Sequence, residues 1–140
     1  MENFKKLLND KEKMKHYFIY IVFGVLTTIV DFSTFFILDS IFMNLNENIS
    51  NTVAVFVATV FAYFTNREYV FKSQGKNKLK EFIKFFIGRM ASMLFNIIAF
   101  WLLTTFTEIN ELIVKVGISV IVIILNYIIS KLFVFGGKEI

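Results

Sequence analysis

A few charged side chains stand inside long apolar segments, and they are the residues most able to do chemistry. Arg89 lies seven residues after Phe82 in one such segment, while Asp31 and Lys115 interrupt two others. A charge buried in an apolar segment is costly, so such residues usually line a substrate or ion path. Arginine adds a planar fork that fits phosphate oxygens. These residues predict an anion site within an apolar protein.

Each of these side chains also has a second interpretation. Arg89 and Lys115 can extend along apolar surface to reach water or headgroups. Asp31 can pair with either cation, carry a proton, or accept a hydrogen bond from a sugar hydroxyl. The amides of Asn96 and Asn126 can bind a ligand or join two helices. We keep these alternatives open.

A second group of candidate residues occurs twice, at Asn66–Phe71 and at Ser130–Phe135. Each segment places one cation, Arg67 or Lys131, beside aromatic side chains. Aromatic and cationic residues commonly anchor helices at the headgroup level of a membrane. The same combination suits a lipid phosphate, because the cation meets its charge and the apolar groups meet its chain. We predict two equivalent capture sites.

The composition argues against several classes of protein. The chain has no cysteine, and His16 is its single histidine. Disulfide scaffolds, thiolate metal sites and histidine clusters are therefore not expected. We find no glycine-rich phosphate loop, nucleophile elbow or Asp-x-Asp motif. The sequence predicts a protein that is not an enzyme and that needs no cofactor or metal.

Apolar segments dominate the chain and predict its fold class. Hydrophobic residues make up 56% of the 140 residues, against about 45–50% in soluble domains. A membrane-spanning helix needs about 20 apolar residues, and four stretches qualify: residues 17–42, 49–66, 82–106 and 112–135. Lipid cannot satisfy exposed backbone groups, so spanning segments must be helical. The first stretch is too long for a cleaved signal peptide. We expect an all-α membrane protein with four transmembrane helices.

Lysine and arginine are distributed unevenly between the connections. The N-terminal arm, residues 1–16, and the loop between the second and third stretches are rich in lysine. The connections Met43–Asn48 and Thr107–Glu111 contain neither lysine nor arginine. The positive-inside rule then places both termini in the cytoplasm of a multi-pass protein of the cell membrane. The basic arm is explained by topology and anionic lipid, and no nucleic acid partner is expected.

The second half of the chain repeats the first when it is shifted by 64 residues. Identical pairs include Gly24 and Gly88, Asn46 and Asn110, and Phe71 and Phe135, and the glycines predict close approach of helices. Two spans per half predict one domain, residues 1–140, built as a parallel two-plus-two repeat with a substrate path between halves. The polar groups differ between halves, in the pairs Val25/Arg89, Asp31/Phe95, Phe32/Asn96, Asn51/Lys115 and Ala62/Asn126.

Spaced motifs in all four stretches resemble the GtrA-like family of small four-span membrane proteins, over residues 17–135. The residues that carry the resemblance are Phe18, Gly24, Thr28, Asp31 and Leu38, then Asn51, Ala54, Asn66, Arg67, Tyr69, Val70 and Phe71, then Phe82, Phe85, Arg89 and Ser92, and last Lys115, Asn126, Ser130, Lys131, Phe133, Val134 and Phe135. Tyr69 and Phe133 stand where the family usually has Trp, and Tyr127 stands where it has Phe.

The resemblance implies translocation of a polyprenyl-phosphate-linked sugar across the cell membrane, for glycosylation of teichoic acid or surface polysaccharide. The implied partners are the lipid bilayer, membrane glycosyltransferases and, since four helices enclose little volume, a second copy of the chain. Two other functions remain open: a small proton-coupled multidrug exporter and a non-transporting assembly partner of a glycosyltransferase. The residues expected to bind substrate are Arg89, Lys115, Asn126, Asn66, Arg67, Lys131, Asp31, Asn96, Asn51 and Phe85.

Overall fold

The computed structural model describes residues 2–42 and 47–136, and these residues form helices and short connections. The helices are α1 (Glu2–Ile41), α2 (Glu47–Thr65), α3 (Lys78–Phe106) and α4 (Glu111–Ile129). A π-helical turn follows each even-numbered helix, η1 (Asn66–Val70) after α2 and η2 (Ser130–Val134) after α4. The predicted all-α class is confirmed. The repeat partner Asn46 lies outside the described residues.

All four predicted apolar stretches are helices long enough to cross a membrane, at Leu8–Ile41, Ile49–Val70, Lys78–Phe106 and Glu111–Val134. Side chains fix where two of them begin. The side-chain Oδ1 of Asn77 accepts a hydrogen bond from the Lys80 backbone N–H at 3.0 Å. The side-chain Oδ1 of Asn110 accepts one from the Leu112 backbone N–H at 2.9 Å. Each bond satisfies a donor that the first turn of a helix leaves free.

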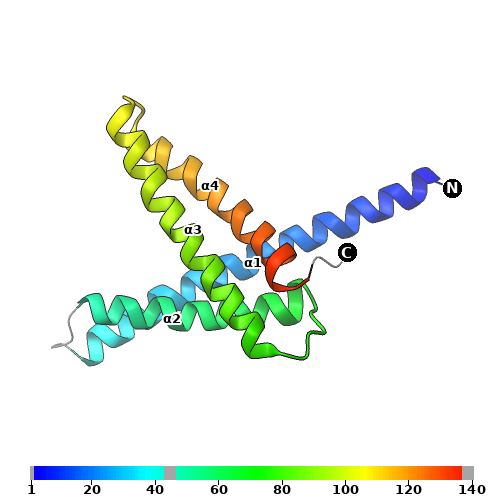
Figure 1. Ribbon diagram of the computed structural model, residues 1–140, viewed down its shortest axis with the longest axis horizontal. Helices are drawn as coiled ribbons and strands as arrows, with labels where there is room; N and C mark the ends of the chain where they lie inside the picture. Colours follow the sequence, from blue (N-terminus) through cyan, green and yellow to red (C-terminus); the bar gives the residue numbers. More distant parts are fainter. Residues whose placement is uncertain (1, 43–46, 137–140) are drawn as a thin grey trace. The chain divides into compact units, whose positions relative to one another are not determined.

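The chain divides into two compact units, one ending at Gln74 and the other starting at Gly75. In the first unit, α1 packs against α2 and η1, and in the second unit α3 packs against α4 and η2 (Figure 1). Each unit is therefore a helical hairpin whose second helix ends in a π-helical turn. We call them the first and second hairpins.

The bounds of the second helix and of the π-helical turn in each hairpin repeat with the same shift of 64 residues as the sequence. Helices α2 and α4 correspond residue for residue, and so do η1 and η2. The correspondence reaches the backbone after each π-helical turn, where Lys72 and Gly136 have positive φ angles of 45° and 77°. The sequence repeat is thus accompanied by a repeat of these helix bounds and of the backbone turn that follows them. That the two halves cross the membrane in the same direction stays a prediction.

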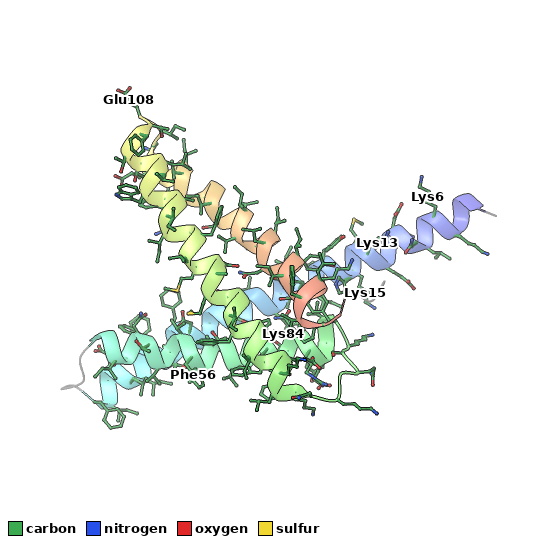
Figure 2. The ribbon with its side chains drawn as sticks, in the orientation of Figure 1. Lys6, Lys13, Lys15, Phe56, Lys84 and Glu108 are labelled. Atoms are coloured by element: carbon green, nitrogen blue, oxygen red, sulfur yellow. The ribbon has the colours of Figure 1, made fainter. Side chains whose placement is uncertain are left out.

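Helix α1 continues through the basic N-terminal arm without a break. Its 40 residues correspond to about 60 Å at 1.5 Å per residue, which is about twice the thickness of the hydrocarbon core. Lys6, Lys13 and Lys15 project from this extension (Figure 2). The arm is therefore a helical extension of the first span, and its lysines lie beyond the apolar part of α1.

The two repeat-related glycines differ in their packing. A Cβ atom built on Gly88 would lie 2.6 Å from Cγ2 of Ile129, so α3 and α4 approach closely only because Gly88 has no side chain. The prediction of close approach is confirmed there. Apart from the backbone of its own helix, no described atom lies within 4 Å of a Cβ built on Gly24, so close approach is not observed there within the first hairpin. Thr65 stands at the position equivalent to Ile129, and its hydroxyl bonds back to its own helix.

Candidate functional site

The π-helical turns place the residues of the two repeated segments. In η2 the Phe135 N–H donates to the Ser130 carbonyl at 3.0 Å, and in η1 the Phe71 N–H donates to the Asn66 carbonyl at 2.8 Å. Each bond joins residues five apart, the spacing that defines a π-helix. Short π-helical segments inside α-helical ones are frequent at functional sites. Both segments with a cation therefore lie in turns of unusual geometry.

Side chains explain why the helix widens at η1. The Thr65 hydroxyl donates to the Phe61 carbonyl at 2.9 Å and to the Ala62 carbonyl at 3.2 Å. The Asn66 side-chain NH₂ donates to the same Ala62 carbonyl at 2.7 Å. These bonds offer the carbonyls an alternative to the regular helical ladder. At the start of η2, the Ser130 backbone N–H is shared between the Asn126 and Tyr127 carbonyls.

Arg89 lies on α3 and rests on an aromatic side chain one turn earlier. Its guanidinium carbon is 5.7 Å from the centre of the Phe85 ring, within the distance for cation–π attraction. The Phe85 side chain is buried, with 3% of its surface exposed. The Phe85 ring also lies 6.3 Å from the ring of Phe135. Contacts thus connect Phe135, at the end of η2, through Phe85 to the cation on α3.

The contact between Gly88 and Ile129 sets the level of Arg89 relative to α4. Since Arg89 follows Gly88 and Lys131 lies two residues after Ile129, the two cations lie at nearly the same level of the hairpin. Asn126 precedes Ile129 by three residues, less than one helical turn. The structure therefore brings Arg89, Asn126 and Lys131 to one end of the second hairpin. Asn126 and Lys131 are partly exposed there.

Lys115 and Asn96 lie away from this group. Lys115 precedes Ile129 by 14 residues on α4, about 21 Å along the helix axis, and its side chain is exposed. Asn96 lies seven residues beyond Arg89 on α3, about 10 Å along that helix. Glu108 lies between α3 and α4, at the tip of the second hairpin (Figure 2). The residues predicted to bind substrate in this half thus lie at three levels. Arg89, Asn126 and Lys131 lie toward one end of the hairpin, Asn96 about 10 Å from Arg89, and Lys115 toward the other end.

The first hairpin places its candidate residues differently. Arg67 is buried and its Nη1 donates to Oε1 of the exposed Glu68 at 2.9 Å. The Asn66 side-chain oxygen is buried, and no described residue donates a hydrogen bond to it. Asp31 lies partly buried in the apolar part of α1, ten residues before the end of that helix, and Asn51 is exposed in the first turn of the apolar part of α2. Asn66 and Arg67 are adjacent, whereas Asn51 lies about 22 Å along the helix from them.

The second hairpin therefore presents a cation on an aromatic support, with a second cation and an amide at the same level. This set of donors suits an anion with several oxygens, such as a phosphate. Among the described residues, no cluster of three His, Asp or Glu side chains is placed to hold a metal ion. Phe85 is buried beneath Arg89, so it supports the cation and has little surface left for a lipid chain.

Sequence reasoning overlooked three features of this site. Ile129 sets the depth of Arg89, and the apolar run around it gave no sign of a special role. The Phe135 ring supports Phe85, although the sequence only suggested an anchor at the headgroup level. The Ser92 hydroxyl donates to the Gly88 carbonyl at 3.0 Å inside the packed hairpin. The equivalent Thr28 hydroxyl donates to the Gly24 carbonyl at 3.2 Å. The Thr28/Ser92 pair in the sequence was the signal that these two positions are equivalent.

Comparison with known proteins agrees with the membrane-spanning helices. The family model for the GtrA/DPMS transmembrane domain matches residues 19–135. A cell wall teichoic acid glycosylation protein GtcA from Listeria monocytogenes is 32% identical, and the alignment covers 99% of this chain and all of the relative. GtcA from Listeria innocua is 36% identical, over 86% of this chain and 84% of the relative. The uncharacterized membrane protein YwcD of Bacillus subtilis is 34% identical, over 83% and 93% of the two chains.

Four apolar helices with charged groups at selected depths define a multi-pass integral membrane protein. Within that class, the chain belongs to the GtrA/DPMS transmembrane domain family, which matches nearly its whole length. The family and the names of its relatives support a role in glycosylation.

Proposed function

We propose that this protein moves a polyprenyl-phosphate-linked monosaccharide from the inner to the outer leaflet of the cytoplasmic membrane. A membrane glycosyltransferase then transfers the sugar to teichoic acid or another surface polysaccharide. The observation that carries the proposal is Arg89, a cation on α3 that is supported by Phe85 and lies level with Lys131. A monophosphate with a long apolar chain needs such a cation inside an apolar protein.

In this proposal the protein acts by binding and moving the lipid, and it breaks no covalent bond. Arg89, Lys131 and Asn126 bind the phosphate and neighbouring sugar oxygens at one end of the second hairpin. Lys115 offers a second cation about 21 Å farther along α4. The two positions suit the phosphate before and after translocation, because each lies toward a different end of a membrane-spanning helix. The aliphatic and aromatic surface of the helices accompanies the chain.

The direction of transport depends on topology, and we propose that both termini and the lysine-rich loop are cytoplasmic. The chain contains no native cysteine, so single cysteines at the exposed residues Gln74 and Glu108 report separately on the two sides. We expect a membrane-impermeant maleimide to label Glu108→Cys in intact cells and Gln74→Cys only after permeabilisation. Labelling of Gln74→Cys alone in intact cells would invert the proposed orientation.

Translocation itself is tested with the purified protein in proteoliposomes that contain a fluorescent polyprenyl-phosphate monosaccharide. Dithionite quenches only the fluorophore in the outer leaflet, so transport enlarges the pool that is quenched. We expect wild-type protein to enlarge this pool faster than empty vesicles do, and Arg89→Leu at equal density to resemble empty vesicles. Wild-type vesicles that match empty ones would reject transport and favour an assembly partner of a glycosyltransferase.

A further inference from the structure

We propose that Phe85 and Phe135 are positioning residues, which hold the Arg89 guanidinium in the orientation that binds a lipid phosphate. In this view the backbone at the end of η2 determines the orientation of a cation on α3. The inference rests on the proposed function for its ligand, and it adds a specific physical link between a π-helical turn and the anion site.

The first step of the link is the contact between Arg89 and Phe85. The guanidinium carbon lies 5.7 Å from the ring centre, and the ring is almost completely buried. Attraction between a guanidinium and an aromatic face grows as the pair is removed from water. A long arginine side chain would otherwise lose considerable rotamer freedom on binding a ligand. Support from Phe85 reduces that loss, because the guanidinium is already held near one orientation.

The second step is the contact between Phe85 and Phe135. Their ring centres are 6.3 Å apart with the planes tilted by 50°, and Phe135 is also buried, with 7% exposed. Phe135 is held by its N–H bond to the Ser130 carbonyl at 3.0 Å, and the chain turns immediately afterwards at Gly136 with a φ of 77°. The position of the Phe135 ring is therefore set by η2, and this ring in turn limits where the Phe85 ring can lie.

The first hairpin shows that this stack is more than a requirement of the shared backbone. Phe71 follows η1 as Phe135 follows η2, but it packs against His16 at 5.5 Å and Tyr20 at 6.5 Å. Ile21 and Val25 occupy the positions equivalent to Phe85 and Arg89. The aromatic support and the cation thus occur together in one half and are both missing from the other. Such a joint difference is expected when one side chain serves the other.

The chain offers a direct spectroscopic test because it contains only two arginines, Arg67 and Arg89. Protein labelled with ¹⁵N-arginine in detergent micelles gives two side-chain Nε–H signals, which Arg89→Lys assigns. We expect the Arg89 signal to carry a ring-current shift that Phe85→Leu removes and Phe135→Leu reduces. The Arg67 signal, from the other hairpin, is the internal control. Phe133→Leu, at an exposed ring beside Phe135, is the matched variant and should leave both signals unchanged.

An Arg89 signal that is insensitive to Phe85→Leu would overturn the proposal. It would also be overturned if Phe135→Leu had no more effect than Phe133→Leu. These outcomes do not depend on any ligand, so they are separate from failure of the proposed function, which would appear as absent transport by wild-type protein.

A binding measurement then connects orientation to affinity. The probe is a polyprenyl monophosphate, titrated into the protein in nanodiscs of neutral lipid. Pentafluorophenylalanine at position 85 keeps a ring of similar shape and removes its attraction for a cation. We expect it to raise Kd by about 2- to 30-fold, and Phe135→Leu to raise it severalfold, while Phe133→Leu has no effect. Unchanged affinity with the fluorinated ring, in a protein whose wild-type form binds the lipid, would show that Phe85 only fills space.

Discussion

In the first hairpin, Phe71 follows a π-helical turn and packs against His16 and Tyr20 of α1. In the second hairpin, Phe135 follows the equivalent turn and packs against Phe85 of α3. The backbone is the same in both, with equivalent bonds between residues five apart. The two hairpins therefore end in equivalent π-helical turns, but the phenylalanine that follows each turn packs against different side chains.

The cations differ in the same way. Arg67 in η1 is buried and paired with Glu68, whereas Lys131 in η2 is partly exposed and has Leu132 at the position of that acid. Arg89 has Val25 as its equivalent, so the shared scaffold does not require a cation at that depth. A cation that one half omits without loss of the hairpin is expected to serve a ligand or an ion pair. Under the proposed function, the first half has an architectural role and the second half binds the anion.

The largest effect is expected from neutralising the repeated cations. Lys131→Gln should greatly reduce surface glycosylation while the protein still inserts at normal levels, because Lys131 lies at the level of Arg89. Arg67→Gln should lower the amount of folded protein, since it removes the ion pair with Glu68 and changes a buried side chain. The measurement is surface glycosylation divided by the amount of inserted protein.

The double variant Arg67→Gln, Lys131→Gln should abolish glycosylation. Normal glycosylation by this double variant would show that both residues serve only as anchors. Equal losses per inserted protein for the two single variants would restore the simpler view of two equivalent capture sites.

The next effect concerns the close contact of α3 and α4. Gly88→Ala places a methyl group against Ile129, where a Cβ would lie 2.6 Å from Cγ2. Overpacking of this kind costs about 1–3 kcal/mol. Gly24→Ala is the matched control, and it should be neutral or raise stability by about 0.5–1 kcal/mol through helix propensity. Thermal unfolding in detergent measures both, and equal destabilisation would mean that the two hairpins pack alike.

The smallest effect is expected where the backbone turns after each π-helical segment. Lys72 has a φ of 45°, in the left-handed region that costs a residue with a side chain about 1–2 kcal/mol. Lys72→Gly should therefore stabilise the first hairpin by about 1 kcal/mol, whereas Gly136→Ala should destabilise the second by a similar amount. The unfolding midpoints of the two variants, compared with that of wild type, test whether the two stability changes have opposite signs. Two shifts of the same sign would argue that the turns are not equivalent.

The helices could be predicted from the sequence because membrane insertion constrains them strongly. About 20 apolar residues can cross a bilayer only as a helix, and the duplication fixed the equivalent positions in both halves. Charge in apolar segments likewise indicated Arg89 directly. The ends of the helices were harder to predict from the sequence, because hydropathy marks only the apolar part of a helix. The side chains of Asn77 and Asn110 set where α3 and α4 begin.

Other features could not be predicted because they depend on individual contacts between helices. At η1 the side chains of Thr65 and Asn66 donate to backbone carbonyls, whereas η2 forms with Ile129 at the position equivalent to Thr65. Gly24 and Gly88 are identical in sequence, yet only Gly88 meets a bulky neighbour, Ile129. The stack of Arg89 on Phe85 also depends on Phe135, which lies 50 residues later in the chain. Equivalent positions in the two halves of the sequence therefore predicted the backbone conformation better than they predicted the surroundings of each side chain.

The central claim is that Arg89 binds the phosphate of the lipid, and its most direct test is the affinity of a polyprenyl monophosphate for the protein in nanodiscs. We predict that Arg89→Lys raises Kd by about tenfold or more, because a point charge cannot reproduce the two-pronged contact of a guanidinium. The double variant Arg89→Leu, Asp31→Leu should bind as weakly as Arg89→Leu alone. Wild-type affinity in Arg89→Lys, or full recovery in the double variant, would contradict the claim and place Arg89 in the scaffold.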